Sequence, residues 1–271
     1  QYIFVNITSS YLIFNKKYIN MEWTIIFGRY IESIELRKLP DNDSYINNLP
    51  VIKNLIKIKK IDLNNSVAFF VGENGTGKST LLEAIAVSCG FNPEGGTKNF
   101  CFSSRDTHSN LYEYLKLSKK AHPKDGFFFR AESFYNVASN IEDLDDIVAG
   151  SPKITDSYGG ISLHKQSHGE SFLSLVQNRF GGKGLYILDE PEAALSPLKQ
   201  MSLLSSINEL VKKESQFIIA THSPILLAFP DALIYELTET GINIKSYKET
   251  EHYIISKEFL NHPEKMLRYL L

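Results

Sequence analysis

Residues 67–80 read VAFFVGENGTGKST, an apolar run followed by a glycine-rich loop. Residues 72–79 satisfy the pattern GxxxxGK[ST] at each fixed position, after an expected strand and before an expected amphipathic helix. Gly72, Gly75 and Gly77 allow the backbone to curl, so that successive N–H groups point at phosphate oxygens. The helix that follows adds its positive N-terminal end. This stretch therefore predicts a phosphate-binding loop in an α/β fold.

The polar residues of the loop have the chemistry that a nucleoside triphosphate requires. Lys78 is expected to reach the β- and γ-phosphates and to act in catalysis, and the Ser79 hydroxyl is expected to ligate Mg²⁺. The candidate nucleotide-binding residues here are Gly72, Asn74, Gly75, Thr76, Gly77, Lys78, Ser79 and Thr80. The alternative is a glycine-rich turn without a ligand, which the intact strand–loop–helix context disfavours.

A second acidic site lies downstream, where residues 185–191 read LYILDEP. Two carboxylates follow an apolar run, as at the carboxyl end of a strand buried on both faces. Asp189 is expected to hold Mg²⁺ through water, and Glu190 is expected to polarise the attacking water as a general base. The alternative is an acidic turn in which Glu190 only caps a neighbouring group. Together with the phosphate loop, this pair predicts a nucleotide hydrolase.

Short apolar runs alternate with segments of helical period along the rest of the chain. The expected core strands are 67–71, 127–129, 185–188 and 217–220, and the expected helices are 79–89, 109–119, 170–180 and 197–213. Segments 34–37 and 56–63 are expected as strands of an antiparallel N-terminal β lobe. Strands alternating with helices predict an α/β fold with a mostly parallel core sheet flanked by helices. A small helical or irregular lid is expected at about 91–168.

Composition limits the partners of the chain. The net charge is −2, so contact with nucleic acid would need a local basic patch. The candidate clusters are Lys57, Lys59 and Lys60, and Lys116, Lys119, Lys120 and Lys124, for which solvated surface lysines are the favoured interpretation. No apolar stretch reaches roughly 18 residues, so no membrane span is expected. Cys89 and Cys101 lack the spacing of a metal site, and a reduced, cytoplasmic setting is expected.

Residues 1–20 differ in character from the segment that follows. They mix bulky apolar residues with Asn, Thr, Ser and Lys, without the early charge and unbroken apolar run of a signal peptide. A plausible domain start follows Met21. We expect residues 1–20 to be a non-native or upstream extension, with an N-terminal strand at the sheet edge as the alternative. Residues 21–271 are expected to form one ATPase domain.

The motifs VGENGTGKST (71–80), SHGES (167–171), YILDEPEAALS (186–196) and ATHSP (220–224) occur in the order found in the ABC-type ATPase superfamily. Over roughly residues 24–271, the chain resembles small stand-alone bacterial predicted ATPases of that superfamily, often labelled AAA-family ATPases. It is also similar to the ATPase heads of SMC, RecF and double-strand-break-repair proteins. The resemblance implies a P-loop NTPase of the ABC-ATPase type.

The resemblance implies further roles by position. Ser167, Gly169 and Glu170 match the signature motif, which in such proteins contacts the γ-phosphate held by a second subunit; a helix-capping turn is the alternative. His222 matches the switch histidine that senses the γ-phosphate, and its alternative role is to help cap a following helix. Ser196 stands where transporters usually carry Asp, and it also fits a helix N-cap.

Two positions depart from the transporter pattern. No Gln follows the strand at 127–129, where transporter ATPases carry one that meets Mg²⁺ and the nucleophilic water. Glu132 or Ser133 could serve instead, and Arg130 could meet phosphate. The alternative is a strand end at which Arg130 forms an ion pair with Glu132. No adenine-stacking residue is identifiable, although Trp23 and Tyr45 lie upstream.

The motifs together imply Mg²⁺-dependent ATP binding and hydrolysis by a homodimer that holds ATP between two protomers. The load that hydrolysis drives is expected on an unidentified partner protein. Three functions stay open. The first is an SMC- or repair-like ATPase acting in DNA maintenance or defence. The others are the nucleotide-binding subunit of an ABC transporter, and an ATP-dependent dimerising switch with negligible turnover.

Overall fold

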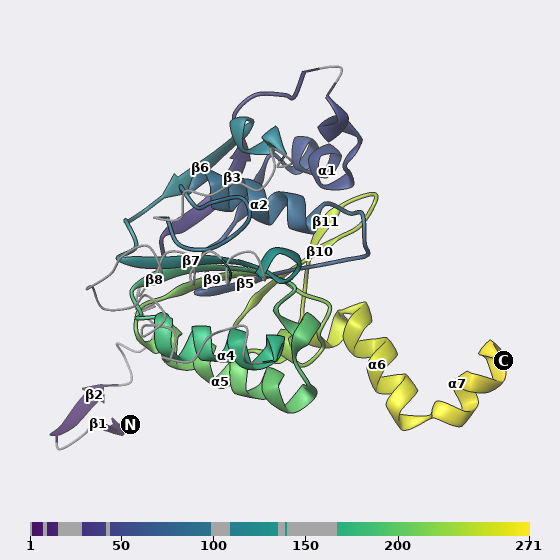
Figure 1. The fold of residues 1–271 in the computed structure, drawn as a ribbon. Helices are drawn as coiled ribbons and strands as arrows, with labels where there is room; N and C mark the ends of the chain where they lie inside the picture. Colours follow the sequence, from purple (N-terminus) through teal and green to yellow (C-terminus); the bar gives the residue numbers. More distant parts are fainter. Residues whose placement is uncertain are drawn as a thin grey trace.

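The computed structural model describes residues 2–7, 10–15, 29–41, 44–98, 109–134, 139 and 167–271. Its main sheet has six strands in the order β11-β10-β5-β9-β8-β7 (Figure 1). These strands are β5 (Val67–Val71), β7 (Asp125–Arg130), β8 (Gly184–Asp189), β9 (Gln216–Ala220), β10 (Leu233–Leu237) and β11 (Ile242–Lys245). Neighbours from β10 to β7 are parallel, and β11 is antiparallel to β10. The predicted mostly parallel core is confirmed.

Helices cover both faces of the main sheet. α2 (Lys78–Ser88) lies on one face, whereas α4 (His168–Arg179) and α5 (Pro197–Lys212) lie on the other (Figure 1). Neighbouring residues of β5 therefore point into two different hydrophobic clusters: Phe70 packs with Leu81 of α2, and Phe69 packs with Leu203 of α5. This two-sided burial explains why β5 is apolar along its whole length.

A separate three-stranded antiparallel sheet lies on the α2 side, in the order β4-β3-β6 (Figure 1). Its strands are β3 (Ile31–Leu36), β4 (Lys60–Asp62) and β6 (Leu115–Lys119), with α1 (Pro50–Ile58) beside them. This sheet is the predicted antiparallel N-terminal lobe. The predicted strand at 56–63 is wrong over its first part, because Pro50 starts a helix that buries Val51, Ile52 and Leu55 at helical spacing.

The predicted helix at 109–119 is also wrong. Only Asn110–Glu113 forms a 3-10 turn, and β6 follows it directly. Within β6, Leu115 and Leu117 face the core and Lys116 is exposed, so the alternation of a strand prevails in the pairing with β3. The expected lid at 91–168 therefore contains two strands, β6 and β7. Residues 99–108 and 140–166 lie outside the described residues.

At the N-terminus, β1 (Tyr2–Ile7) and β2 (Ser10–Asn15) pair antiparallel with each other. Neither strand joins the other two sheets, so the alternative of a strand at the sheet edge is not what these described residues form. Residues 16–28, including Met21 and Trp23, lie outside the described residues. That residues 1–20 are an extension stays a prediction.

At the other end of the chain, α6 (Glu251–Asn261) and α7 (Pro263–Leu270) extend away from the sheets (Figure 1). The remaining short elements are 3-10 helices: Tyr45–Asn48 (η2), Ala131–Ser133 (η4), Pro191–Ala194 (η7), Leu226–Ala228 (η8) and Tyr247–Glu249 (η9). Among the helices that the structure describes, none is long and apolar enough to cross a membrane.

Candidate nucleotide-binding site

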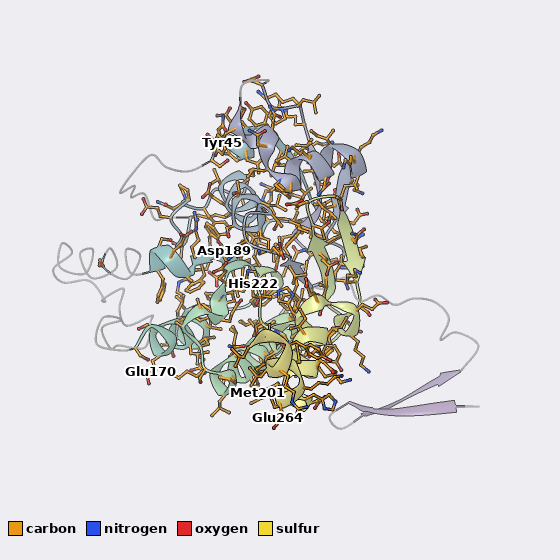
Figure 2. All side chains as sticks on the ribbon, turned by 90° about the vertical axis from the view of Figure 1, so that its right-hand side faces the viewer. Tyr45, Glu170, Asp189, Met201, His222 and Glu264 are labelled. Atoms are coloured by element: carbon orange, nitrogen blue, oxygen red, sulfur yellow. The ribbon has the colours of Figure 1, made fainter. Side chains whose placement is uncertain are left out.

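The predicted motifs meet at one edge of the main sheet. Strand register places Phe70 of β5 opposite Ala220 of β9, Ala220 opposite Asp189 of β8, and Asp189 opposite Arg130 of β7. The segments after these four strands therefore begin at the same level, where parallel α/β sheets bind ligands at their carboxyl ends. Asp189 and His222 lie at this edge (Figure 2).

The loop after β5 has the backbone shape that the glycine pattern predicts. Gly72, Gly75 and Gly77 have φ angles of 142°, 85° and 97°, a region that L side chains rarely adopt. At two of them a side chain would also collide. A Cβ on Gly72 would lie 2.1 Å from the carbonyl oxygen of Leu237, and one on Gly77 would lie 2.4 Å from Val51 Cγ1. The loop leads directly into the N-terminus of α2.

The Lys78 ammonium group lies inside this loop and is almost fully buried. Its Nζ donates to the carbonyl oxygens of Gly72, at 2.6 Å, and Glu73, at 2.9 Å. Burial lowers the pKa of Lys78, and the Glu190 carboxylate is the strongest opposing influence. A phosphate oxygen is a charged and therefore stronger acceptor than the two carbonyls. The buried ammonium is thus placed to bind an anion.

The other predicted loop residues differ in their surroundings. Thr76 is buried and its hydroxyl donates to the Glu73 carbonyl oxygen at 2.8 Å. Asn74 is exposed at the tip of the loop, and Thr80 is half-buried in the first turn of α2. The structure brings all of them into one loop and helix N-terminus, while their contacts to a nucleotide stay predictions.

Ser79 and Asp189 form the predicted metal pair. The Ser79 hydroxyl donates to Asp189 Oδ1 at 3.0 Å, and only 3% of Asp189 is exposed. Burial raises the pKa of Asp189 to about 6, although the Arg130 charge and the Ser79 hydrogen bond act against this rise. Among the described residues, no group of three His, Cys, Asp or Glu is arranged to hold a metal. The two hard oxygen donors suit Mg²⁺, which takes its other ligands from water and phosphate.

Glu190 follows Asp189 in a left-handed backbone conformation, with φ 52° and ψ 51°. Its N–H donates to the Ala220 carbonyl at 3.0 Å, which ties this turn to β9. The side chain is 43% exposed, and its Oε1 lies 3.8 Å from Nε2 of His222. An accessible carboxylate directly beside the buried Asp189 has the placement that a general base needs.

His222 is held between two elements that the motif pattern did not predict. Its backbone N–H donates to Oε1 of Glu192, in η7, at 2.6 Å. Its ring Nδ1 lies 3.3 Å from Nε2 of His252, in the first turn of α6. Burial and the Lys78 charge lower the pKa of His222, so the imidazole is neutral at pH 7. Glu192 lies within YILDEPEAALS (186–196) but had no predicted role, and His252 lies in none of the quoted motifs, so the sequence did not predict either contact.

Helix capping, the alternative role considered for His222, is carried out by the next residue, Ser223. Ser223 Oγ accepts from the backbone N–H groups of Ile225 and Leu226, at 3.1 and 3.2 Å, just before η8. Ser223 is also bonded to the Gln200 side chain of α5. The imidazole of His222 is therefore not needed as a cap here.

At the position that lacks Gln, the structure contains the Arg–Glu pair that the sequence left as an alternative. Arg130 pairs with Glu83 of α2 at 2.5 Å and also with Glu132. Its Nε is buried, has no hydrogen-bond partner within the described ranges, and lies 3.9 Å from Asp189 Oδ2. Ser133 donates to the Glu94 carbonyl. Of Arg130, Glu132 and Ser133, Arg130 is therefore the residue whose described contacts include Asp189.

Ser167, Gly169 and Glu170 lie apart from the phosphate loop. Glu170 Oε2 accepts from the N–H of Ser167, at 3.1 Å, and from its hydroxyl, at 2.7 Å, while Ser167 Oγ accepts from the Glu170 N–H. This is a capping box at the start of α4, as the alternative interpretation predicted. Glu170 lies well away from Asp189 and His222 (Figure 2). A single chain does not bring these two groups of residues together.

Gly169 joins the start of α4 to the turn after Glu190. A Cβ on Gly169 would lie 2.3 Å from the Ala194 carbonyl oxygen, so the two backbones are in close contact. Ser196 Oγ accepts from the Lys199 N–H at 3.4 Å and caps α5, the structural role that the sequence offered for it. The turn that contains Ala194 is therefore packed directly against the first turn of α4.

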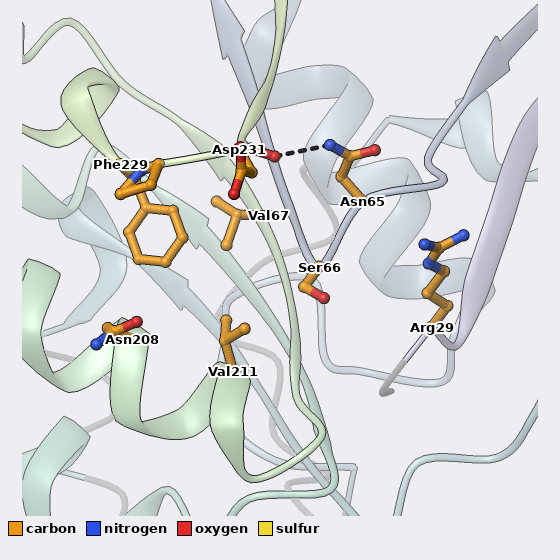
Figure 3. A pocket seen from close by; sticks show the side chains of 9 residues that line it. Arg29, Asn65, Ser66, Val67, Asn208, Val211, Phe229 and Asp231 are labelled. Atoms are coloured by element: carbon orange, nitrogen blue, oxygen red, sulfur yellow. Dashed lines mark hydrogen bonds between the residues drawn. The ribbon is translucent and has the colours of Figure 1, made fainter. Parts of the chain in front are cut away.

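Tyr45 and a surface pocket both lie outside the candidate nucleotide site. Tyr45, at the start of η2, is exposed and lies away from Asp189 (Figure 2). A pocket of about 420 Å³ lies at the opposite, amino-terminal end of β5 (Figure 3). It is lined by Arg29, Asn65, Ser66, Val67, Asn208, Val211, Phe229, Pro230 and Asp231. None of the predicted site residues lines it.

A model of a family described as AAA domain matches residues 46–257. Over 154 residues the chain is 27% identical to the chromosome partition protein Smc of Methanocaldococcus jannaschii, covering 48% of this chain and 13% of that protein. Over 225 residues it is 24% identical to the macrolide export ATP-binding/permease protein MacB of Hahella chejuensis, covering 71% of this chain and 32% of that protein. The chain thus spans a third or less of the length of these curated relatives.

Three solved structures are also similar. The SMC head domain from Thermotoga maritima is 14% identical with a TM-score of 0.39, and the match covers 80% of this chain and 98% of that chain. A nucleotide-free ATP-binding cassette from an ABC transporter is 16% identical with a TM-score of 0.44, and the match covers 87% of this chain and 96% of that chain. For cbiO1 from Clostridium perfringens the identity is 17% and the TM-score 0.44, and the match covers 90% of this chain and 100% of that chain. No functional conclusion follows from TM-scores of this size.

Proposed function

The chain belongs to the AAA domain family and is an ABC/AAA-type ATPase head similar to SMC, and from this premise we propose that it binds and hydrolyses ATP with Mg²⁺. One observation carries the proposal. The buried Lys78 ammonium, the bonded Ser79–Asp189 pair and the accessible Glu190 carboxylate converge at one edge of the parallel sheet. These are an anion site, a hard-metal site and a base, the three groups that hydrolysis of a phosphoanhydride requires.

In the proposed complex, the chain binds ATP mainly through its phosphates. The N–H groups of the 72–77 loop and the N-terminus of α2 direct partial positive charge at phosphate oxygens. Lys78 adds a full charge in a buried setting, where it is little screened by water. Ser79 and Asp189 would hold Mg²⁺, which when bound neutralises charge on the β- and γ-phosphates.

For hydrolysis, Glu190 accepts a proton from the attacking water as the bond from the water oxygen to the γ-phosphorus forms. The bond from that phosphorus to the β–γ bridging oxygen breaks, which releases ADP and inorganic phosphate. Glu190 suits this role because its side chain is accessible, whereas the neighbouring Asp189 is buried. His222 lies beside Glu190 and would contact the γ-phosphate.

The proposal includes a head-to-tail homodimer. Ser167 and Glu170 are exposed and lie apart from the phosphate loop of their own chain, so a second protomer would present them to the γ-phosphate. Two-fold symmetry then closes two equal sites. We expect this dimer to work in the cytoplasm with a partner protein.

The process served by hydrolysis is proposed in order of preference. The relatives are named for chromosome partition and for macrolide export, and we favour DNA maintenance or defence over a transporter subunit. A dimerising switch with negligible turnover is the third proposal.

The two lysine clusters give little support to DNA binding. Lys60, Lys116 and Lys120 form ion pairs with Asp62, Glu35 and Glu32 on the antiparallel sheet, which leaves less free positive charge for phosphate.

The variant Lys78→Ala tests the proposal. We expect it to weaken ATP affinity by about a hundredfold or more, since it removes charge-assisted hydrogen bonds worth a few kcal/mol. Calorimetry with Mg²⁺ and ATP measures this change. Lys53→Ala is the matched control, because Lys53 is exposed on α1 outside the loop and should bind ATP like the wild type. Unchanged affinity in Lys78→Ala would refute the assignment of the phosphate loop.

A further inference from the structure

A side chain of the C-terminal helix reaches the nucleotide site. His252, in the first turn of α6, places Nε2 at 3.3 Å from Nδ1 of His222, with the ring centroids 5.4 Å apart and the planes tilted by 50°. Both rings are half-buried. The direction of this hydrogen bond depends on which nitrogen of each ring carries the proton.

The groups around His222 decide that direction. Its Nε2 is buried, has no hydrogen-bond partner among the described residues, and lies 3.8 Å from the Glu190 carboxylate. A carboxylate can only accept a hydrogen bond, and so can a fully ionised γ-phosphate. The favourable state therefore has the proton on Nε2. Because a neutral imidazole has a single N–H, Nδ1 is then an acceptor.

His252 supplies the donor that this acceptor needs. With its proton on Nε2, His252 donates to Nδ1 of His222 and leaves its own Nδ1 unprotonated. That nitrogen is buried and has no hydrogen-bond partner in the part of the chain that the structure describes, as suits an atom without a proton to donate. In the reverse arrangement, a lone pair on His222 Nε2 would face the Glu190 carboxylate, which is repulsive.

Both rings are neutral at pH 7, so the choice between tautomers is a real one. Burial is the largest cause of the lowered pKa of His222 and of His252, and the two rings also disfavour a second charge so close together. The charged or titratable groups that face the pair come from α2, η7, β10 and α6: Lys78, Glu190, Glu192, Glu236 and Glu251.

We propose that His252 is a positioning residue, whose Nε2–H fixes the His222 tautomer that presents Nε2–H to Glu190 and to the γ-phosphate. The part that concerns the γ-phosphate rests on the proposed function. Because His252 lies in the first turn of α6, the same hydrogen bond ties the C-terminal helices to the nucleotide site.

The first test needs no ATPase activity. In nucleotide-free protein with ¹⁵N-labelled histidine, long-range ¹H–¹⁵N spectra at pH 7.5 report the tautomer of each ring. We expect His222 to be protonated on Nε2 in the wild type and in His252→Gln, which keeps an N–H donor near the position of Nε2. In His252→Leu we expect a mixture of tautomers. A wild-type His222 protonated on Nδ1, or an unchanged tautomer in His252→Leu, would overturn the proposal.

The second test is kinetic. Loss of one hydrogen bond corresponds to a fall in kcat of about tenfold in His252→Leu, with KM unchanged within about twofold. His252→Gln should restore most of this loss, and His262→Leu, at the exposed far end of α6, is the control for an altered helix surface. Equal loss in the Gln and Leu variants would count against the donor role. If the wild type has no ATPase activity, the proposed function fails, while the spectra still decide the tautomer.

Discussion

Asp189 is the residue that should make metal binding depend on pH. Burial raises the pKa of its carboxyl to about 6, and Mg²⁺ binds only the ionised form. Affinity for ATP in the presence of Mg²⁺ should therefore fall as the pH drops through about 6. The terminal phosphate of a nucleotide takes up a proton in the same range, so Asp189→Asn serves as the reference. Calorimetry between pH 5 and 8 should show the two affinities converging at low pH; a constant ratio would contradict the assignment.

Arg130 lies at the end of β7, near the position where transporter ATPases carry Gln, and it has a charged side chain in place of a neutral amide. Transporter ATPases carry Gln after this strand, and here the guanidinium pairs with Glu83 and Glu132 while its Nε faces Asp189. A positive charge at this point lowers the pKa of Asp189, in opposition to burial. The Arg130 charge therefore favours the ionised form of Asp189, the predicted metal ligand.

Among the elements, the contact between α4 and the turn after β8 gives a prediction about stability. Gly169→Ala would place a methyl group 2.3 Å from the Ala194 carbonyl oxygen, in a backbone that cannot yield as a side chain does. We expect the free energy of unfolding to fall by about 1–3 kcal/mol, measured by denaturant titration. Gly181→Ala is the control, since its nearest atom, Asp125 Oδ2, is 3.7 Å away and its stability should be close to that of the wild type. Equal stability of the two variants would show that the backbone at the start of α4 shifts to accommodate the methyl group.

The two wrong predictions of secondary structure have the same physical reason. At 50–58 and 115–119, short segments have apolar residues that fit more than one period, and their neighbours in space decide between them. Val51, Ile52 and Leu55 of α1 pack into the core shared with the antiparallel sheet, and β6 is drawn out by pairing with β3. The predicted strand at 56–63 contains β4, but the helix α1, which ends at Ile58, was not predicted. Such pairing joins residues roughly eighty positions apart, which a local pattern does not encode.

At the scale of the whole molecule, the proposed dimer gives the sharpest prediction. Glu190→Gln removes the base while leaving Lys78, Ser79 and Asp189 in place, so it should trap ATP between two protomers. Size-exclusion chromatography with light scattering, with ATP and Mg²⁺, should show a dimer for this variant. The double variant Glu190→Gln and Lys78→Ala should stay monomeric because it lacks the anion site. A monomeric Glu190→Gln at saturating ATP would rule out the sandwich.

The sequence by itself determined the parts of this protein that depend on local backbone chemistry. Gly72, Gly75 and Gly77 predicted a loop that needs positive φ, and the observed angles agree. The apolar runs predicted the buried parallel strands, because a strand covered on both faces has no polar side. The order of the motifs predicted the ABC-type fold. The role of Glu190 follows from the two carboxylates after an apolar strand, and the roles of His222 and the signature residues follow from the resemblance; all of these roles remain predictions.

Only the tertiary structure decided which side chains meet at the edge of the sheet. Parallel register brings Arg130 beside Asp189, and the fold of the C-terminus brings His252 onto His222. Glu192 becomes the support of His222 for the same reason. These contacts join residues that are distant in the chain, and their strength comes from burial and hydrogen-bond geometry that exist only after folding. A motif specifies the backbone that it needs, whereas the surroundings of its side chains are set by the packing of the whole chain.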